Sequence, residues 1–129
     1  MSDPLGASKP TFYVVDDDAV LRKLILGILR DAGLESIGAA ATGEEGMRDC
    51  KDRSPTIALV DINLPGSSGL DVLANLKSLR KPPRVLMVSS EATLERVKTA
   101  MTLGADGFVV KPFTAAKLIS AVETILKKK

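Results

Sequence analysis

The chain has 129 residues, of which 45% are hydrophobic, and this length and composition suit one globular domain with a buried core. Its 18 lysines and arginines against 16 aspartates and glutamates are too small an excess to indicate binding to nucleic acid or to a membrane. The chain has no histidine and one cysteine, Cys50, which excludes a disulfide framework, Ser-His-Asp catalysis and histidine-rich metal sites.

The sequence shows no targeting signal, and we expect a cytoplasmic protein. Residues 1–10 lack the basic and apolar regions of a signal peptide and are predicted to form a polar tail before one domain over residues 11–129. No apolar stretch approaches the ~18 residues of a membrane span. Cys50 is expected to be a small core residue, and a lone thiol suits a reducing compartment.

The first half of the predicted domain alternates between strands and helices. A strand over residues 13–15 is followed by a helix after Asp18, whose apolar pairs recur every four residues until Gly33 ends it. A weaker strand over about 35–40 comes next. Thr42, with a glutamate three residues later, then forms the capping box of a short second helix.

The second half repeats the alternation. A strand over residues 57–60 leads into a turn-rich loop and a helix over about 70–79. Strands over residues 85–88 and 108–110 flank a fourth helix over about 94–101, and Thr114 is the expected N-cap of the last helix. Five strand–helix units predict an α/β domain with a parallel sheet covered on both faces, for which the flavodoxin-like doubly wound order 2-1-3-4-5 is a standard solution.

Polar side chains stand where four of these strands end. Asp16 and Asp17 follow the first strand, Asp61 the third, Ser89 the fourth and Lys111 the fifth. Because parallel strands end at one edge of the sheet, we expect these side chains to converge. Clustered carboxylates repel one another unless a cation is present, and Mg²⁺ prefers carboxylate and phosphate oxygens. The pattern predicts a site for a divalent cation and a phosphoryl group, with Asp61 as the natural acceptor.

A polar residue at a strand end, or next to one, also has a simpler explanation when it is considered alone. Asp18 is assigned to capping the first helix, and Ser90 to capping the fourth, rather than to the site. Ser89 could also be a cap, and Lys111 could be a solvated loop lysine. Agreement among four separate strand ends makes coincidence improbable.

The residues at these strand ends resemble the response-regulator receiver domains, the CheY-like family, from about residue 11 to 128. The matching segments are residues 14–17, 60–66, 87–90 and 107–113. CheY is itself a standard example of the 2-1-3-4-5 order, so the predicted topology and the resemblance are not independent.

The resemblance implies a phosphoacceptor and a metal site. Asp61 would receive a phosphoryl group from a phosphohistidine of a sensor histidine kinase or a phosphotransfer protein. Mg²⁺, or Mn²⁺, would be held by Asp17, Asp61 and the backbone carbonyl of Asn63, with Asp16 acting largely through water. No turnover of a separate substrate is expected beyond phosphorylation and dephosphorylation of Asp61.

It also implies a conformational switch. Ser89 would be the switch hydroxyl, Lys111 would pair with the phosphoryl group, Phe108 would move inward, and the Lys111–Pro112 bond would be cis. The face formed by the fourth helix, fifth strand and fifth helix would then bind a downstream protein, or a second copy of the chain. With no output domain in the sequence, that target is expected to be a separate protein, unless the chain is a piece of a longer one.

Three alternatives remain open at the level of the sequence. The first is a pseudo-receiver that acts as an unphosphorylated scaffold. The second is a magnesium-dependent phosphatase of the haloacid-dehalogenase type, although that family places Asp-x-Asp at one strand end, where this chain has consecutive aspartates. The third is a flavin binder, which the 3% aromatic content disfavours.

Overall fold

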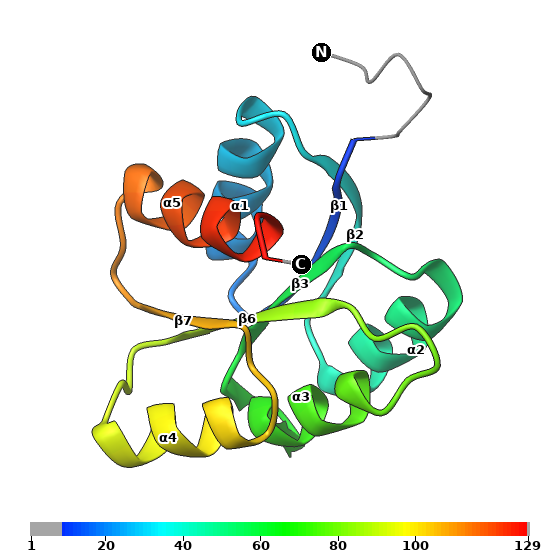
Figure 1. Cartoon of the computed structure of the whole chain (residues 1–129), viewed down its shortest axis with the longest axis vertical. Coiled ribbons are helices and arrows are strands. Elements are labelled where there is room, and N and C mark those ends of the chain that lie inside the picture. Colours follow the sequence, from blue (N-terminus) through cyan, green and yellow to red (C-terminus); the bar gives the residue numbers. More distant parts are fainter. Residues whose placement is uncertain (1–8, 129) are drawn as a thin grey trace.

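The computed structural model describes residues 9–128, so residues 1–8 of the predicted tail lie outside the described residues. Five strands form one sheet in the order β2-β1-β3-β6-β7, and every neighbouring pair is parallel (Figure 1). Since β6 and β7 are the fourth and fifth strands of this sheet along the chain, the predicted order 2-1-3-4-5 is confirmed. The strands are β1 (Thr11–Val15), β2 (Glu35–Ala40), β3 (Ile57–Asp61), β6 (Arg84–Ser89) and β7 (Gly107–Val110).

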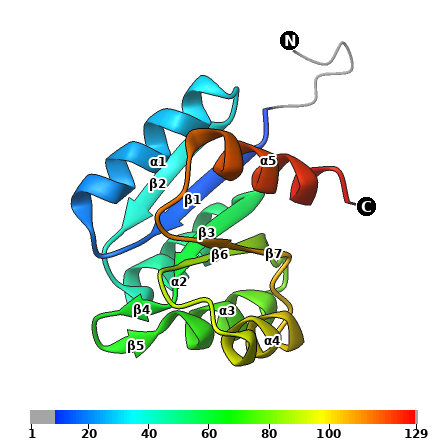
Figure 2. The same cartoon turned by 90° about the vertical axis from the view of Figure 1, so that its left-hand side faces the viewer.

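Helices cover both faces of the sheet (Figure 2). One face carries α1 (Ala19–Asp31) and α5 (Ala115–Leu126), and the other carries α2 (Gly43–Arg53), α3 (Gly69–Lys77) and α4 (Leu94–Thr102). Side chains alternate between the two faces along each strand, so β1 contributes to two separate cores. Phe12 and Val14 pack towards α1 and α5, whereas Tyr13 and Val15 pack towards α2 and α3.

The helix termini follow the predicted capping residues, with one correction. Asp18, Thr42 and Thr114 each accept hydrogen bonds from N–H groups of the first helical turn. The prediction that Ser90 caps the fourth helix is wrong, because α4 begins at Leu94 and the Thr93 hydroxyl accepts from the Arg96 N–H. Serine and threonine are both good caps, but Thr93, not Ser90, directly precedes the helix predicted over about 94–101.

The loop predicted after the third strand contains a small hairpin that the sequence did not indicate. β4 (Asn63–Leu64) and β5 (Ser67–Ser68) pair in antiparallel fashion around Pro65 and Gly66. Gly66 has a φ of +79°, a conformation that glycine adopts easily and that the position after a turn proline often requires.

The single cysteine of the chain lies in the hydrophobic core. Cys50 lies on the buried side of α2, and burial raises the pKa of its thiol to about 12. The expectation of a small core residue is confirmed. None of the helices within residues 9–128 combines the length and the apolar character that a bilayer crossing requires.

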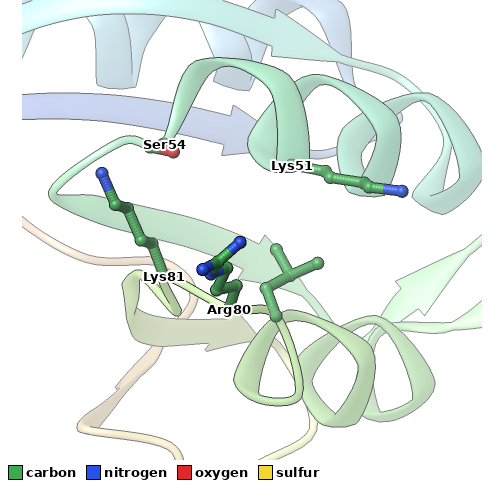
Figure 3. A pocket seen from close by; sticks show the side chains of 5 residues that line it. Lys51, Ser54, Arg80 and Lys81 are labelled. Carbon is green, nitrogen blue, oxygen red and sulfur yellow. The ribbon is translucent and has the colours of Figure 1, made fainter.

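Helices α2 and α3 pack together, and a surface groove lies where the two helices end (Figure 3). The groove lies at the edge of the sheet where β3 and β6 begin, opposite the edge where the predicted site residues gather. Its lining residues are Lys51, Ser54, Leu79, Arg80 and Lys81.

Among the glycines within residues 9–128, Gly69 has the closest neighbouring atoms. A Cβ at this position would lie 1.9 Å from the carbonyl oxygen of Asp61, and the Gly69 N–H donates to the Ile62 carbonyl at 2.6 Å. The absence of a side chain therefore lets the start of α3 fold back against the end of β3, which carries the predicted phosphoacceptor.

Replacing Gly69 with alanine is expected to destabilise the protein by about 3 kcal/mol, because the clash involves backbone that moves only with the strand end. Urea unfolding followed by circular dichroism would measure this loss. Gly27→Ala is the matched control, since Gly27 lies within α1 with no atom near its missing Cβ, and alanine there should add about 0.5–1 kcal/mol. Equal stability of Gly69→Ala and the native protein would contradict this account of the close approach.

Candidate functional site

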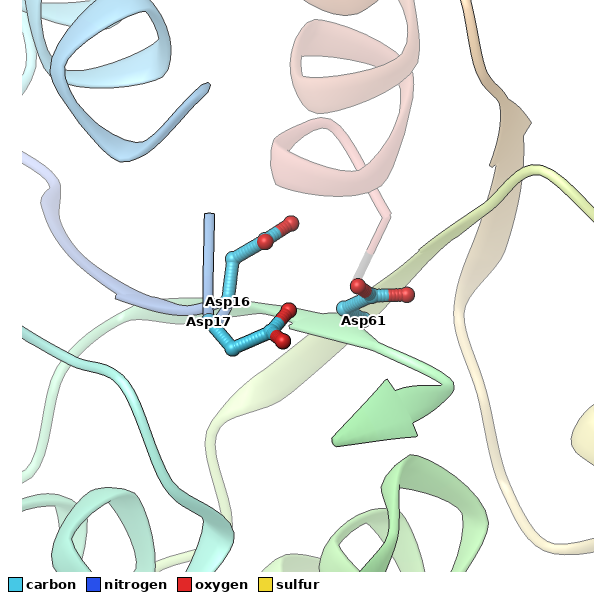
Figure 4. Close-up of side chains that lie close together, drawn as sticks. All are labelled: Asp16, Asp17 and Asp61. Carbon is cyan, nitrogen blue, oxygen red and sulfur yellow. The ribbon is translucent and has the colours of Figure 1, made fainter. Parts of the chain in front are cut away.

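Three aspartates gather at the carboxyl edge of the sheet (Figure 4). Asp16 directly follows β1, and Asp61 is the last residue of β3; because Val15 pairs with Val60, the two aspartates come to lie beside each other. Asp17 follows in the loop that leads to α1. One carboxylate oxygen from each of the three residues lies within 4.8 Å of the others. The convergence predicted from separate strand ends is thus present in the structure.

Lys111 reaches this cluster from the end of β7. Its Nζ donates hydrogen bonds to Asp16 Oδ2 at 2.9 Å and to Asp61 Oδ2 at 3.1 Å. Its backbone N–H donates to the Ser89 carbonyl at 2.8 Å, which fixes the start of the loop, and its peptide bond to Pro112 is cis. Lys111 is therefore a half-buried ion-pair partner, and the interpretation of a solvated loop lysine is wrong.

The site places charges where water has little access. Only 1% of Asp16 and 6% of Asp61 are exposed, whereas Asp17 faces the solvent. Burial raises the pKa of Asp61 above its ordinary value of 3.8, with a smaller contribution from the Asp16 charge, and the hydrogen bonds and charge of Lys111 only partly oppose it.

Lys111 shows the reverse balance. Burial alone would lower the pKa of its ammonium, but the hydrogen bonds to Asp16 and Asp61 and the negative charges of both together outweigh burial and raise it. Lys111 is therefore protonated at neutral pH. One ammonium against three carboxylates leaves the cluster with surplus negative charge.

Backbone groups hold the two buried carboxylates in place. Asp16 Oδ1 accepts from the Asp18 N–H at 2.9 Å, and Asp61 Oδ1 accepts from the Asn63 N–H at 3.2 Å. Each of these carboxylates therefore bonds Lys111 through one oxygen and its own loop through the other. Asn63 itself lies two residues beyond Asp61, at the start of β4.

Ser89 and Phe108 lie on the neighbouring strands. Ser89 ends β6 one residue beyond Val88, the pairing partner of Asp61, and its buried Oγ accepts from the Glu91 N–H at 3.0 Å. Phe108, in β7, pairs with Met87 of β6. It is partly buried against the core on the face covered by α2, α3 and α4. The structure thus places both residues on the strands that flank the cluster.

Arg22 is a site residue that the sequence analysis missed. Its Nη1 donates to the Asp16 carbonyl at 2.6 Å, so the guanidinium fastens the loop that carries Asp16 and Asp17. The available signal was its position one helical turn after Asp18, because helical side chains point back towards the helix N-terminus.

A second missed feature bridges two loops beside the site. Asn63 Nδ2 donates to Glu91 Oε1 at 3.0 Å, and Glu91 Oε2 lies 3.7 Å from an Arg96 guanidinium nitrogen. Nothing in the sequence indicates this contact, since it joins residues 28 positions apart in loops of unpredictable path.

The donor atoms of the cluster suit a hard divalent cation. All three aspartates offer carboxylate oxygens, the ligands preferred by Mg²⁺, Mn²⁺ and Ca²⁺, and no sulfur or imidazole is present. The surplus negative charge would be offset by such an ion. The three aspartates therefore form a group that could hold a metal.

Comparison with known proteins gives a consistent result. A family model described as the response regulator receiver domain matches residues 12–123. The chain is 33% identical over 118 residues to chemotaxis protein CheY-3 of Vibrio cholerae, covering 89% of this chain and 90% of that protein. It is also 33% identical over 125 residues to the transcriptional regulatory protein PrrA of Mycobacterium leprae, covering 96% of this chain but 53% of PrrA.

Solved structures agree with these matches. A chain of the CheX-CheY-BeF3-Mg²⁺ complex from Borrelia burgdorferi superimposes with a TM-score of 0.90 at 30% identity. The superposition covers 96% of this chain and 93% of the other.

Replacing Lys111 with methionine should destabilise the metal-free protein by about 3 kcal/mol near pH 7.5, because two buried carboxylates lose their counter-charge. The loss should be smaller near pH 5. Without Lys111 the pKa of Asp61 rises further, so the folded state holds a proton that the unfolded state has released, and stability falls as the pH rises. Urea unfolding with a chelator at both pH values measures the difference.

The double variant Lys111→Met/Asp61→Asn serves as the control for charge. It should recover about half of the loss, since the asparagine carries no charge that needs compensation, whereas Asp16 still lacks its counter-charge. A loss that is equal at both pH values and is not recovered in the double variant would assign the effect of Lys111 to packing.

Proposed function

Because the chain belongs to the family of response regulator receiver domains, we propose that Asp61 is its phosphoacceptor in two-component signalling. The observation that carries this proposal is the cluster of Asp16, Asp17 and Asp61, joined to Lys111 at one edge of the sheet. The donor would be the phosphohistidine of a sensor histidine kinase or a phosphotransfer protein. No turnover of a separate substrate is part of the proposal.

The metal of this site would be Mg²⁺ or Mn²⁺. Its proposed ligands are Asp17, Asp61 and the carbonyl oxygen of Asn63, with Asp16 acting through water. When bound, the ion would neutralise negative charge on the phosphoryl group and the carboxylates. The similarity to the CheX-CheY-BeF3-Mg²⁺ complex from Borrelia burgdorferi supports this assignment.

The proposed transfer uses one carboxylate oxygen of Asp61 as the nucleophile. An O–P bond forms as the P–N bond of the donor phosphohistidine breaks, and the imidazole leaves with the bonding electron pair and takes up a proton. Lys111, held within hydrogen-bonding distance of Asp61, would pair with a phosphoryl oxygen. The 6% exposure of Asp61 limits access to the carboxylate and restricts the directions from which a donor can approach.

Ser89 and Phe108 would then move in response to the charge added at Asp61. The Ser89 Oγ accepts one hydrogen bond from Glu91, which leaves its hydroxyl proton free to donate to a phosphoryl oxygen. Movement of Ser89 towards Asp61 would make room for Phe108 to turn inward and would change the face formed by α4, β7 and α5.

That face carries the apolar groups that a partner could cover. Leu94 and Met101 of α4 and Val110 of β7 are 71%, 46% and 49% exposed. We infer that this face binds a downstream protein in the phosphorylated state, or a second copy of the chain. The cytoplasm is the proposed compartment, where the lone Cys50 would stay reduced.

Phosphorylation of Asp61 is directly testable with acetyl phosphate and Mg²⁺. We expect intact-mass spectra to show one added phosphoryl group that hydroxylamine removes, as for an acyl phosphate. Asp61→Asn should abolish the adduct, whereas Ser89→Ala should keep it, because Ser89 acts after transfer. If neither acetyl phosphate nor a phosphorylated histidine kinase labels the native chain, it is a pseudo-receiver. Steady release of phosphate from phosphoesters would instead indicate a phosphatase.

Binding of Mg²⁺ should raise the stability of the protein against urea by about 1.4 kcal/mol when the free ion is at about ten times its Kd. Asp17→Asn should remove most of this increase and, since Asp17 is exposed, leave the metal-free stability nearly unchanged. Asp18→Asn is the matched control, because asparagine caps a helix as well as aspartate and Asp18 is outside the cluster. Equal loss of the magnesium effect in both variants would point to general screening of negative charge.

A further inference from the structure

The groove at the ends of α2 and α3 gathers three cations from two separate segments. Lys51 lies in the last turn of α2, and Arg80 and Lys81 follow the end of α3. Figure 3 shows Lys51 and Ser54 on one side of the groove and Arg80 and Lys81 on the other. Within the described part of the chain no carboxylate lines this groove, which has a volume of about 560 Å³.

These three cations make no polar contacts that stabilise the fold, whereas the basic residues around them do. Arg53 donates to the Ile37 carbonyl, Lys77 pairs with Asp106, and Arg84 donates to carbonyls at the end of α5. Across residues 9–128, the side chains of the three groove cations have no hydrogen bond or ion pair. Their charges face solvent and are free to meet an external partner.

The groove offers an apolar surface between its cations, and its frame is stiff. Leu79 is half-buried and packs against the core on the α2 and α3 side. Ser54, in the left-handed conformation with a φ of 48°, ends α2 by donating its N–H to the Cys50 carbonyl. Pro82 and Pro83 restrict the backbone directly after Lys81. A ligand would therefore meet a preformed site rather than a loop that it must order.

We propose that this groove binds an acidic peptide segment of a protein partner, with two or more carboxylates flanking an apolar side chain. The carboxylates would pair with Lys51 on one side and with Arg80 and Lys81 on the other, while the apolar side chain covers Leu79. The volume fits a few side chains rather than a folded surface.

The groove favours a peptide over nucleic acid. A nucleic-acid site needs a long track of cations along a backbone, and single strands also need exposed aromatic rings on which bases stack. This groove is short, and among residues 9–128 no aromatic side chain lines it. A partner held here would remain bound irrespective of the state of Asp61, because the groove lies at the opposite edge of the sheet.

Binding can be tested with a fluorescein-labelled peptide of sequence Glu-Asp-Leu-Glu-Asp. We expect saturable anisotropy changes that weaken as NaCl is raised, and amide shifts in nitrogen-15 spectra centred on residues 51–54 and 79–81. The variant Lys51→Gln/Arg80→Gln/Lys81→Gln should weaken binding about tenfold, since it removes three exposed ion pairs. It should still accept a phosphoryl group at Asp61, which separates this proposal from the proposed function.

The matched control is Lys23→Gln/Lys98→Gln/Lys117→Gln, which removes the same charge from three exposed lysines on other helices. It should change the peptide affinity less than twofold. Equal weakening in both triple variants would show attraction by net charge alone and overturn the proposal, as would absence of binding. A short DNA duplex that produces the same amide shifts at equal or higher affinity would overturn it in favour of nucleic acid.

Discussion

The sharing of one ammonium by two buried carboxylates is the interaction on which the site depends. Asp16 and Asp61 are almost fully buried, and a desolvated charge is costly unless an opposite charge and hydrogen-bond donors meet it. Lys111 and two backbone N–H groups supply this compensation, but only in part, as the raised pKa of Asp61 shows. The remaining negative charge would attract a dication, and it lowers the stability of the protein without a metal.

Such a short-range interaction requires that the strand ends be aligned precisely. Side chains of aspartate are short, so a shift of one residue between β1 and β3 would separate Asp16 from Asp61 and turn one of them to the other face of the sheet. Close packing of helices on the sheet maintains this register. Gly46 is unfavourable inside α2 by helix propensity, yet a Cβ there would lie 2.6 Å from a methyl carbon of Val15, directly before Asp16.

The sequence was sufficient for the features that depend on local pattern and on strand order. Apolar runs that end in Asp61 and Lys111, and caps such as Asp18, follow from periodicity and hydrogen-bonding chemistry, and the sheet order then brings the site together. The β4–β5 hairpin was missed because two-residue strands have no detectable period. The contact of Asn63 with Glu91 was missed because it depends on where two loops lie in space.

That second contact explains how a charge change at Asp61 could reach a distant face. Glu91 donates its N–H to Ser89 Oγ, accepts from Asn63 Nδ2 and faces Arg96 of α4. Ser89 therefore cannot move towards a phosphoryl group on Asp61 without either breaking its bond to residue 91 or pulling that residue along. In the second case the bridge to Asn63 and the contact with Arg96 would be disturbed together. If Ser89 acts as the proposed switch hydroxyl, these polar contacts would couple it to Arg96 in the first turn of α4.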